Sequence, residues 1–349
     1  MKTKTDVLNY LKNNVKSPRP GQTVNTEFFR PEDAMGVVST CYAVYGEGYP
    51  VDTYYIPEKL IEENQKGNIH SVVARNADED VVGHGALYHS SSPYAGMYEA
   101  GQYIIWKPYR GLGVIQEIDR YVTMLCPEKY DIAAMYGEPV TNHTITQKMG
   151  QIRGFIETAL EIDLMPAQAY EAEESAQGRV STLLTFKIRK DHPHTIYLPA
   201  AYQERICQDI AELSLDRIAG PGQTGMPGAG KTKTIPEFFD FAGVGRLQVT
   251  CTGEDIYRAI QEFEDEIQKK EFQVTQLFLP LDQAGTDTLC THLNGRGYFY
   301  GGYLPRWFGT DAILMQKVLP RPCFEGLKLY SDKAKQLLDY VRKDWERIA

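Results

Sequence analysis

The sequence predicts a mixed α/β fold of the α+β class, in which a central, mainly antiparallel sheet is flanked by helices and the whole arrangement is repeated in tandem. Segments rich in β-branched and aromatic residues, typical of strands, alternate with segments whose apolar residues recur every three or four positions, as in amphipathic helices. The order of these segments in the first half returns in the second half. The 349 residues suffice for two domains, each with a core of its own.

The first half is expected to form one sheet interrupted by helices. Its predicted elements are an N-terminal helix, a strand (23–29), a helix from 31, a helix (57–65), three antiparallel strands (70–75, 80–89 and 97–106), a helix from 114, a strand (132–136), a helix (142–151) and two strands (154–164 and 180–188). A short polar turn between the first two antiparallel strands suits a hairpin.

The second half is expected to repeat the end of this series. Its predicted elements are a linker helix, a strand (245–251), a helix (254–270), a strand (273–279), a helix (287–294), two strands (297–304 and 311–319) and a final helix (327–347). The predicted divisions are an N-terminal helix and tether (1–22), a first domain (23–190), a linker helix with a glycine-rich loop (191–234) and a second domain with a C-terminal helix (235–349).

The composition argues against several classes of protein. The chain is 42% apolar and 24% charged, with no apolar run long enough to span a bilayer. Six cysteines lie far apart without a C-x-x-C pair, which argues against a zinc ribbon and a disulfide framework. The net charge of −9 disfavours nucleic acid as the main partner. We therefore expect a cytoplasmic protein without a metal, and without nucleic acid or a membrane as partner.

The stretch Tyr98–Gly113 carries the clearest functional signal. Its strand stops at Pro108, and two glycines, Gly111 and Gly113, precede an amphipathic helix that begins at Val114. A strand that opens through glycines into a helix presents a concave array of free backbone N–H groups, and the helix dipole favours negative charge at the same place. This pattern predicts a site for phosphate or pyrophosphate.

The order of elements, with the glycine loop after the third antiparallel strand, resembles the GNAT N-acetyltransferase family over residues 23–190. Tyr109–Gly113 is similar to the family's Gln/Arg-x-x-Gly-x-Gly/Ala loop, and Asn142–Phe155 is similar to its Asn…Lys-x-Gly-Phe pattern. The resemblance implies an acyl-CoA donor, with acetyl-CoA expected first, whose pyrophosphate lies in the loop. The residues implied as coenzyme contacts are Ile104, Ile105, Trp106, Tyr109, Arg110, Gly111, Leu112, Gly113, Val114 and Asn142.

The sequence departs from the family pattern at two positions. Pro108 stands where the loop usually begins with Gln or Arg, so one side-chain contact is missing. Met149 stands nearest to the place where many members carry a tyrosine as general acid, and a thioether cannot donate a proton. Asn142 also has a structural interpretation, as the N-cap of its helix.

Acyl transfer from a thioester to an amine needs a base for the amine, a fixed approach and a donor for the tetrahedral oxyanion. The resemblance implies that a backbone N–H near Ile105 polarises the carbonyl. Glu99 is the first candidate base, and Glu138 and His143 are further candidates for acid or base. Their structural alternatives are a solvent-facing strand end, a structural turn and a helix-start histidine, respectively. His84 is expected to be packed or hydrogen-bonded within its strand.

The second half is expected to bind no coenzyme A. Its repeat is visible in three matching sets of positions: Pro139 and Pro280, Gly154-Phe155 and Gly297-Tyr298, Met165-Pro166 and Leu304-Pro305. The counterpart of the phosphate loop is Cys251–Asp255, which holds one glycine and two acids that repel a pyrophosphate. The second half therefore reads as a degenerate GNAT-like domain.

Gly225–Thr232 fits the nucleotide-binding pattern G-x-x-x-x-G-K-[ST] letter for letter. Phosphate binding by that pattern needs a buried strand before the loop and a helix after it. Residues 218–224 do not read as a buried strand, and Pro236 stops a helix after one turn. We interpret the stretch as a linker that matches by chance; the alternative is a nucleotide hydrolase that uses Lys231.

The predicted function is that of an acyl-CoA-dependent N-acyltransferase, in which the amine of a small-molecule or peptide acceptor attacks the thioester directly. A non-catalytic acyl-CoA sensor is the alternative, motivated by Met149, and the P-loop hydrolase through Gly225–Thr232 is a further one. The acidic run Glu171, Glu173 and Glu174 is expected to be a solvated loop or the border of a cleft for a cationic amine. A homodimer is left open.

Overall fold

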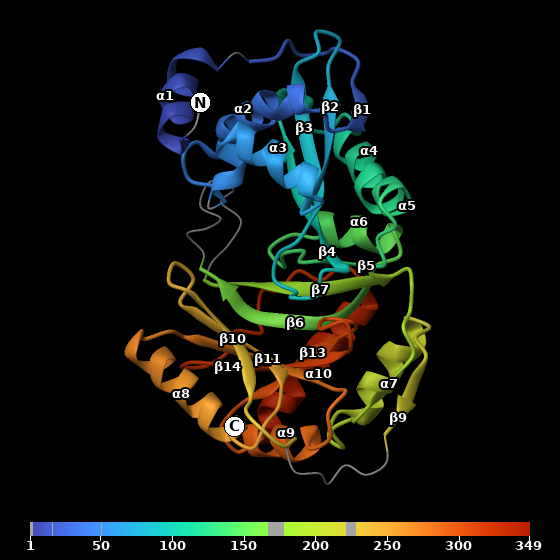
Figure 1. Ribbon diagram of the computed structural model, residues 1–349, viewed down its shortest axis with the longest axis vertical. Coiled ribbons are helices and arrows are strands. Elements are labelled where there is room, and N and C mark those ends of the chain that lie inside the picture. The colour runs from blue at the N-terminus through green and yellow to red at the C-terminus, as the bar shows by residue number, and fades with distance from the viewer. Residues whose placement is uncertain (1–2, 16, 50, 167–177, 221–227) are drawn as a thin grey trace. The chain divides into compact units, whose positions relative to one another are not determined.

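Figure 1 shows the computed structural model of the chain, which describes residues 3–15, 17–49, 51–166, 178–220 and 228–349. The fold is mixed α/β and its sheet is mainly antiparallel, as the sequence predicts. The chain divides into two compact units, one of residues 1–91 with 98–132 and the other of residues 92–97 with 133–349.

The first unit contains four antiparallel strands that neighbour one another in chain order, β1-β2-β3-β4. Its elements are α1 (Lys4–Asn14), β1 (Asn25–Phe28), η1 (Pro31–Asp33), α2 (Ala34–Tyr45), η2 (Asp52–Tyr55), α3 (Pro57–Lys66), β2 (Ile69–Arg75), β3 (Val81–Tyr88), β4 (Met97–Ile105), η3 (Lys107–Tyr109), α4 (Val114–Arg120), the π-helical turn η4 (Tyr121–Leu125) and α5 (Cys126–Lys129).

Helices cover both faces of these four strands. α2, η2 and α3 pack on one face through a core that includes Cys41, Tyr55 and Leu60. α4 packs on the other face, where the side chain of Ile118 fills the space left by Gly83 and Gly85. A Cβ at either glycine would stand less than 3 Å from that side chain, so the small residues set how closely the helix approaches.

A buried ion pair fixes the start of α2. Arg75, at the end of β2, donates from Nε to Asp33 Oδ1 at 2.7 Å and from Nη2 to Asp33 Oδ2 at 2.5 Å. The Asp33 carboxylate also accepts the N–H of Arg30 at 2.6 Å, and Glu27 on β1 accepts from Arg75 at 2.8 Å. Because Arg75 and Asp33 are both buried, removal of either partner alone leaves an uncompensated charge in the core.

The second unit contains eight strands in the order β5-β7-β6-β13-β14-β12-β11-β10, and a separate pair, β8-β9. Its elements are β5 (Ala134–Gly137), α6 (Ile145–Ile152), β6 (Ile156–Met165), β7 (Val180–Ile188), β8 (His194–Ile196), α7 (Gln203–Glu212), β9 (Arg217–Ala219), β10 (Lys233–Phe239), β11 (Val244–Cys251), α8 (Ile256–Lys269), β12 (Val274–Pro280), α9 (Thr286–Asn294), β13 (Phe299–Leu304), β14 (Ala312–Val318) and α10 (Asp332–Ile348).

The order of strands in this unit is internally symmetric, because β5-β7-β6 is followed outward by its counterpart read in reverse, β13-β14-β12. The two sets meet where Gly302 of β13 pairs with Ala159 of β6. A Cβ at Gly302 would stand 2.2 Å from the Cα of Ala159, so only glycine allows this approach. Beside the junction, the side-chain amide of Gln316 accepts the N–H of Ile162 at 2.9 Å and donates to the carbonyl of Leu160 at 2.8 Å.

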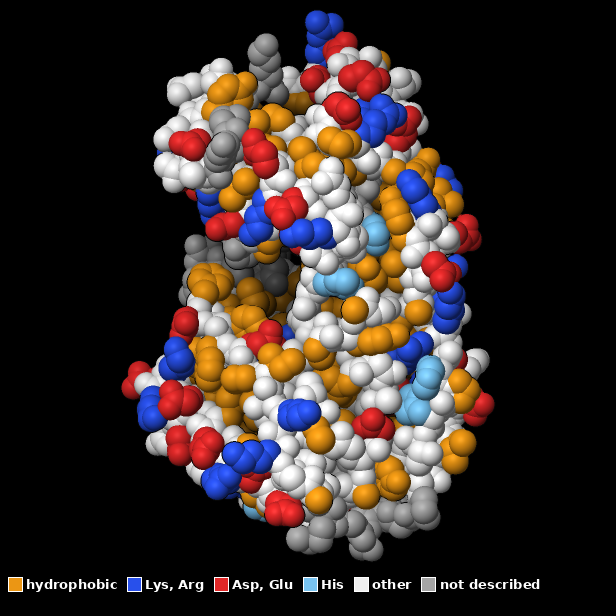
Figure 2. Space-filling view, viewed as in Figure 1, with side chains coloured by type: hydrophobic (Ala, Val, Ile, Leu, Met, Phe, Trp, Pro, Cys, Tyr) orange, Lys and Arg blue, Asp and Glu red, His pale blue; other side chains and the backbone are white. Residues whose placement is uncertain are grey.

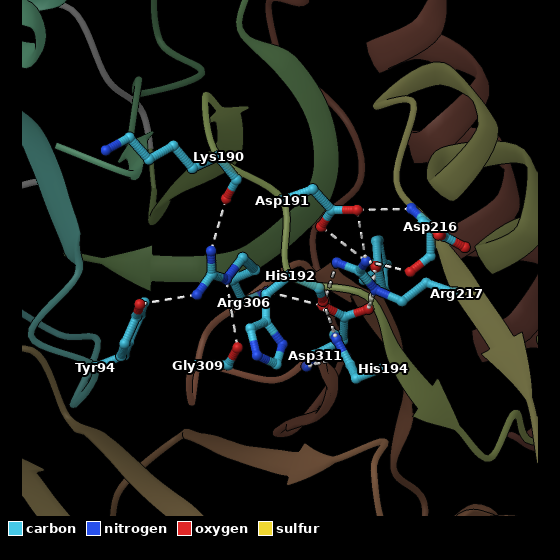
Figure 3. Close-up of polar contacts among 11 residues, drawn as sticks. Tyr94, Lys190, Asp191, His192, His194, Asp216, Arg217, Arg306, Gly309 and Asp311 are labelled. Atoms are coloured by element: carbon cyan, nitrogen blue, oxygen red, sulfur yellow. Dashed lines mark hydrogen bonds and ion pairs between the residues drawn. The ribbon is translucent and has the colours of Figure 1, made fainter. Parts of the chain in front are cut away.

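The loop after β13 is fixed by Asp311, which is fully buried (Figure 3). Its carboxylate accepts from Arg217 of β9 at 2.6 Å, from the Tyr303 hydroxyl at 2.5 Å and from the N–H of Arg306 at 2.9 Å. His194 of β8 lies 3.5 Å from the same carboxylate. Burial alone raises the pKa of Asp311, but His194 and Arg217 hold it below its usual value. The carboxylate therefore stays charged.

Arg306 binds the same loop to the rest of the unit (Figure 3). It lies in the left-handed region at φ 55°, which is rare for a side chain of this size. Its guanidinium donates to the carbonyl of Lys190 at 2.6 Å, to the hydroxyl of Tyr94 at 2.8 Å and to the carbonyl of Gly309 at 3.3 Å. The three acceptors compensate for the strained backbone.

α8 covers the strands of the second half with one apolar side. Ile256, Ile260, Phe263 and Ile267 are buried at helical spacing. Its outer side carries charges of both signs, which Figure 2 shows at the lower left; Lys269 and Glu266 form an ion pair there at 2.5 Å. Such exposed pairs contribute little to stability, so the helix is held by its apolar side.

One local prediction was wrong, and one strand was not predicted. The helix predicted from Asn142 begins at Ile145, with Thr144 at the N-cap position, so Asn142 is not the N-cap. The chain remains paired with β7 through the bridge between Val140 and Thr182, which delays the helix. Residues 233–239, divided between linker and second domain by the sequence, form strand β10, where Pro236 is tolerated because β10 is an edge strand.

His84 gives the first unit a pH-dependent stability. It is fully buried, as the sequence predicts for a packed histidine, with Nε2 3.1 Å from the Ser71 hydroxyl and Nδ1 3.1 Å from the Gln102 carbonyl. Burial lowers its pKa from 6.5 to about 4, although the Gln102 carbonyl favours the protonated form. Between pH 6.5 and 4 the unfolded chain binds a proton at His84 that the folded chain does not bind. The contribution of His84 to the free energy of unfolding is therefore complete above pH 6.5 and is lost as the pH falls towards 4.

We expect the free energy of unfolding to fall by about 2 kcal/mol for this group between about pH 7.5 and about pH 5. His70, whose pKa burial also lowers to about 4, adds a similar contribution. In urea denaturation, His84→Gln should therefore remove about half of the pH dependence that these two histidines contribute. His292→Gln, at an exposed histidine on α9, is the control and should leave it unchanged. A His84→Gln protein with the pH dependence of the wild type would contradict this account.

Candidate functional site

The glycine loop joins the end of β4 to the start of α4. Gly111 and Gly113 have φ angles of 78° and 81°, in the left-handed region where glycine is preferred. Gly113 is the N-cap residue of α4, and Leu112 between the two glycines is 60% exposed. Within the described part of the chain, the backbone N–H groups of Gly111, Leu112 and Gly113 donate to no acceptor. The loop thus presents three free donors ahead of a helix, as the sequence predicts.

Two buried aromatic side chains, Tyr109 and Trp106, hold this loop in place. Tyr109 is fully buried, and its hydroxyl donates to the carbonyl of Arg19 and accepts from the Asn76 amide at 3.3 Å. Trp106 is 9% exposed, and its Nε1 donates to the Thr40 hydroxyl at 2.9 Å. Both rings therefore anchor the loop, and any contact of Tyr109 with a ligand would come from its backbone.

Arg110 lies at the surface beside the free N–H groups. Its Nε donates to the carbonyl of Ile105 at 3.2 Å, which folds the side chain back across the end of β4. Among the described residues, Nη1 and Nη2 of Arg110 have no partner, so these two donors can bind an anion in the loop. Val114, the first residue of α4, is 6% exposed and packs in the core.

β4 carries a bulge just before the loop. Its register against β3 shifts between His84 and Ala86, which oppose Ile104 and Gly101, so β4 has an extra residue there. Gln102, at the bulge, has φ 59°. A bulge bends its strand and re-aims the neighbouring backbone groups. The bend therefore lies directly ahead of Ile104 and Ile105, which are 2% and 6% exposed.

Glu99 stands on β4 on the same face as α2 and η2, opposite Tyr88. Its carboxylate accepts the Ser90 hydroxyl at 2.5 Å. Burial and the Glu99 charge both raise the pKa of Tyr54, so the two side chains are near neighbours. Tyr54 is 1% exposed, and its hydroxyl has no hydrogen-bond partner among the described residues.

The neighbours of Glu99 include two tyrosines that the sequence does not single out. Tyr49 donates to the Gln102 side chain at 2.6 Å, and its ring meets that of Tyr54 edge to face at 5.7 Å. Tyr54 in turn meets His84 at 5.4 Å. No local pattern marks these residues: Tyr54 lies in the 3-10 turn η2 and Tyr49 in the segment before it, and both meet β4 only in the folded chain.

The other candidate residues belong to the second unit, in the connection from β5 to α6. Glu138 follows β5 directly, and Asn142 is 6% exposed. His143 Nδ1 accepts the N–H of Ile145 at 3.3 Å, which gives it a structural role at the start of α6. Met149 lies on α6, where it offers no proton.

In the second half, the chain itself occupies the position that corresponds to the glycine loop. The N–H of Gly253 donates to the Thr232 hydroxyl at 3.0 Å, and the N–H of Glu254 donates to the Gly230 carbonyl at 3.0 Å. Asp255 accepts the N–H of Thr232 at 2.7 Å, and the Thr232 N–H and hydroxyl lower the Asp255 pKa to about 2. These N–H groups ahead of α8 are already bonded, which supports the prediction that the second half binds no coenzyme A.

The same contacts account for the nucleotide-binding pattern. The described part, Gly228–Thr232, leads into strand β10 and not into a helix, so Lys231 lacks the surroundings that phosphate binding needs. Residues 225–227 of the pattern lie outside the described part of the chain, as do Glu171, Glu173 and Glu174.

The described residues contain no group of three His, Cys, Asp or Glu side chains placed to hold a metal ion. Within the same residues, the search for a helix of sufficient length and apolar character to span a bilayer finds none.

No family model matches the sequence, and no curated protein matches it. Solved structures similar to parts of the chain are acetyltransferases. The ribosomal-protein-S5-alanine acetyltransferase from Vibrio fischeri has 11% identity and a TM-score of 0.38, and the match covers 50% of this chain and 97% of that chain. A spermidine/spermine N-acetyltransferase from Vibrio cholerae has 12% identity and a TM-score of 0.37, with 48% and 95% covered.

An acetyltransferase of the GNAT family from Staphylococcus aureus Mu50 has 15% identity and a TM-score of 0.35, with 48% of this chain and 100% of that chain covered. The family named there is the one that the sequence resembles. Each of these structures corresponds to about half of this chain.

Alanine substitutions should cost different amounts of stability in the two loops, Gly111–Gly113 with its free N–H groups and Cys251–Asp255 with its bonded ones. At Gly253 a Cβ would stand 2.4 Å from the Gly230 carbonyl and 2.5 Å from the backbone of Lys231 and Thr232, so the closing segment must move. At Gly111 a Cβ meets nothing within 4 Å, and only the positive φ opposes it. We expect Gly253→Ala to cost about 2–3 kcal/mol of unfolding free energy and Gly111→Ala about 1 kcal/mol. Urea denaturation measures both, and equal costs would argue against the closed arrangement.

Proposed function

We propose that the chain is an acyl-CoA-dependent N-acyltransferase that uses acetyl-CoA and acetylates the amine of a small-molecule or peptide acceptor. The observation that carries the proposal is the loop before α4, where the N–H groups of Gly111, Leu112 and Gly113 have no acceptor in the described residues. A pyrophosphate supplies convergent acceptor oxygens of the right charge for such a loop. Arg110 adds two free donors beside it.

The surrounding elements support the coenzyme A donor over a generic phosphate. The loop follows the third of three antiparallel strands and opens into a helix, the position that the GNAT resemblance implies. The bulge at Gln102 bends β4 immediately before it. In the proposed complex, the backbone of Ile104 to Trp106 lines the pantetheine arm. Asn142, which belongs to the other unit, stays a prediction of the family resemblance.

The proposed reaction is direct attack. The neutral amine of the acceptor forms a C–N bond to the thioester carbonyl carbon, the carbonyl oxygen becomes an oxyanion that accepts an N–H near Ile105, and the C–S bond then breaks. Glu99 takes the amine proton, directly or through water, because a base within hydrogen-bond reach must remove it. The thiolate leaves with the electron pair and takes its proton from solvent, since Met149 has none to give. Glu138 and His143 are proposed second to Glu99, because His143 already serves the start of α6.

Turnover of acetyl-CoA with a panel of amines tests the proposal through the release of free thiol. Release that depends on an amine would support it. Tight coenzyme A binding without thiol release on any acceptor would instead favour a non-catalytic acyl-CoA sensor. ATP binding that is lost in Lys231→Ala would favour the nucleotide hydrolase, and both results would contradict an acyltransferase.

Arg110→Gln should weaken the donor site specifically. The variant loses two charged donors at an exposed position, so the KM for acetyl-CoA should rise about tenfold while the fold remains stable. Arg258→Gln is the control, because Arg258 is an exposed arginine in the first turn of α8, away from the glycine loop. An equal KM in both variants would contradict the assignment of the loop.

Glu99→Gln should reduce the chemical step. Loss of a general base lowers kcat by about a hundredfold or more, with the KM for acetyl-CoA nearly unchanged. Glu262→Gln, at a glutamate with 71% side-chain exposure, is the control and should leave kcat unchanged. If Glu99→Gln kept full kcat, Glu138→Gln would be tested next, and the role of Glu99 would be rejected.

A further inference from the structure

A polar cavity of about 470 Å³ lies between α7 and α10 in the second unit. One wall is the side of α7 that carries Glu204, Arg205 and Gln208, and the other is the side of α10 that carries Asp339 and Lys343. The Tyr340 hydroxyl on α10 donates to the Ala201 carbonyl at 3.2 Å and so joins the two walls at one end. No part of the proposed acyl transfer uses these residues.

Most charges around the cavity are neutralised within the protein. Lys343 binds Asp339 at 2.7 Å on the same helix. Arg205 donates from Nη2 and Nε to Asp209 at 2.8 and 3.3 Å, and Lys333 reaches the same carboxylate at 2.7 Å. Of these pairs, only Lys333 with Asp209 joins the two helices, and the Arg205 guanidinium keeps one donor, Nη1, outside its pair.

Two groups of opposite charge keep polar atoms without a partner among the described residues. Arg205 is 7% exposed, and its Nη1 has no hydrogen bond to the described residues. The carboxylate of Glu204, its neighbour in sequence and also in the lining, has no ion pair or hydrogen bond there either. The amides of Gln208 and Gln336 also line the cavity and are equally unpaired in the described part. The lining therefore offers one unbonded N–H edge of an ion-paired guanidinium, one exposed carboxylate without an ion pair within the described chain, and two amides.

A hydroxyl beside the cavity adds an independent observation. Tyr300 is fully buried, and its hydroxyl has no hydrogen-bond partner among the described residues. Its ring meets that of Tyr340 edge to face at 5.3 Å. Burial raises the pKa of Tyr300, Asp209 raises it further and Arg205 lowers it. An unpaired buried hydroxyl is costly, and Tyr300 stands behind Tyr340, which lines the cavity.

We propose that the cavity between α7 and α10 binds a small zwitterion of the α-amino acid class. Its carboxylate accepts from Arg205 Nη1, its ammonium donates to Glu204, and Gln208 and Gln336 contact a polar side chain. A ligand with both charges bonds both Arg205 Nη1 and Glu204, whereas a simple anion leaves Glu204 without a partner and a simple amine leaves Arg205 Nη1 without an acceptor. The cavity lining is too polar for a fatty acyl chain.

Isothermal titration of the full chain with a panel of L-amino acids tests the proposal, with propionate and n-propylamine as half-molecules. We expect saturable binding of one or more amino acids with a Kd of about 1 mM or tighter, and binding of either half-molecule at least about tenfold weaker. No binding of any amino acid would overturn the proposal. Binding of propionate as tight as that of the amino acid would overturn it in favour of a simple anion site.

Variants then place the ligand. Glu204→Gln changes an exposed, unpaired side chain without harm to the fold, and should weaken amino-acid binding about tenfold. Arg205→Gln should weaken it at least as much; since this variant also removes an ion pair to Asp209, Gln208→Ala gives a second test that spares that pair. Lys335→Gln, an exposed lysine of α10 outside the lining, is the control. Undiminished binding in Glu204→Gln and Gln208→Ala would reject the site. None of these outcomes depends on acetyl-CoA turnover.

Discussion

The carboxylate of Asp311 is the interaction on which the arrangement of the second unit depends. A charge without solvent exposure is tolerated only where its oxygens are bonded, and here the donors come from β9, β13 and the loop that follows β13, with β8 beside them. β8 and β9 are three-residue strands with little apolar surface of their own, so this polar centre holds them in place. They flank α7, and the position of α7 sets one wall of the cavity described above. By fixing β8 and β9, the Asp311 carboxylate also fixes α7 between them, and with it the side chains that α7 presents to the cavity.

Much of the fold follows from the sequence because its signals are local. Strand and helix periodicity, the hairpin between β2 and β3 and the repeated order of the second half all follow from residues near one another in the chain. The late start of α6 and strand β10 do not, since each depends on pairing with a distant strand: Val140 pairs with Thr182, and Pro236 lies opposite Leu247. The compact units also divide at residue 132 and not near 190, because β6 joins β13 across a long stretch of chain.

The candidate site divides in the same way. The left-handed conformations of Gly111 and Gly113 can be predicted from the sequence, because glycine before a helix is a local pattern. Gln102 gives no such signal, since its positive φ comes from the register of β3 against β4. Tyr54 reaches the face of β4 through tertiary packing alone. The two acids of Cys251–Asp255 correctly predict a degenerate loop, but the segment that fills it, Gly230–Thr232, carries a pattern that suggests the opposite function until its partners are known.

The junction at Gly302 has a consequence for how such a chain can arise and change. In a single copy of the repeat, β6 or β13 would be the outermost strand and would expose a row of unpaired N–H and C=O groups, a template for aggregation or strand exchange. Duplication lets each copy cover the open edge of the other at the cost of one obligatory glycine. The two halves are thereby joined in one sheet: a chain cut between residues 191 and 234 would expose the edges of β6 and β13 in the separated pieces.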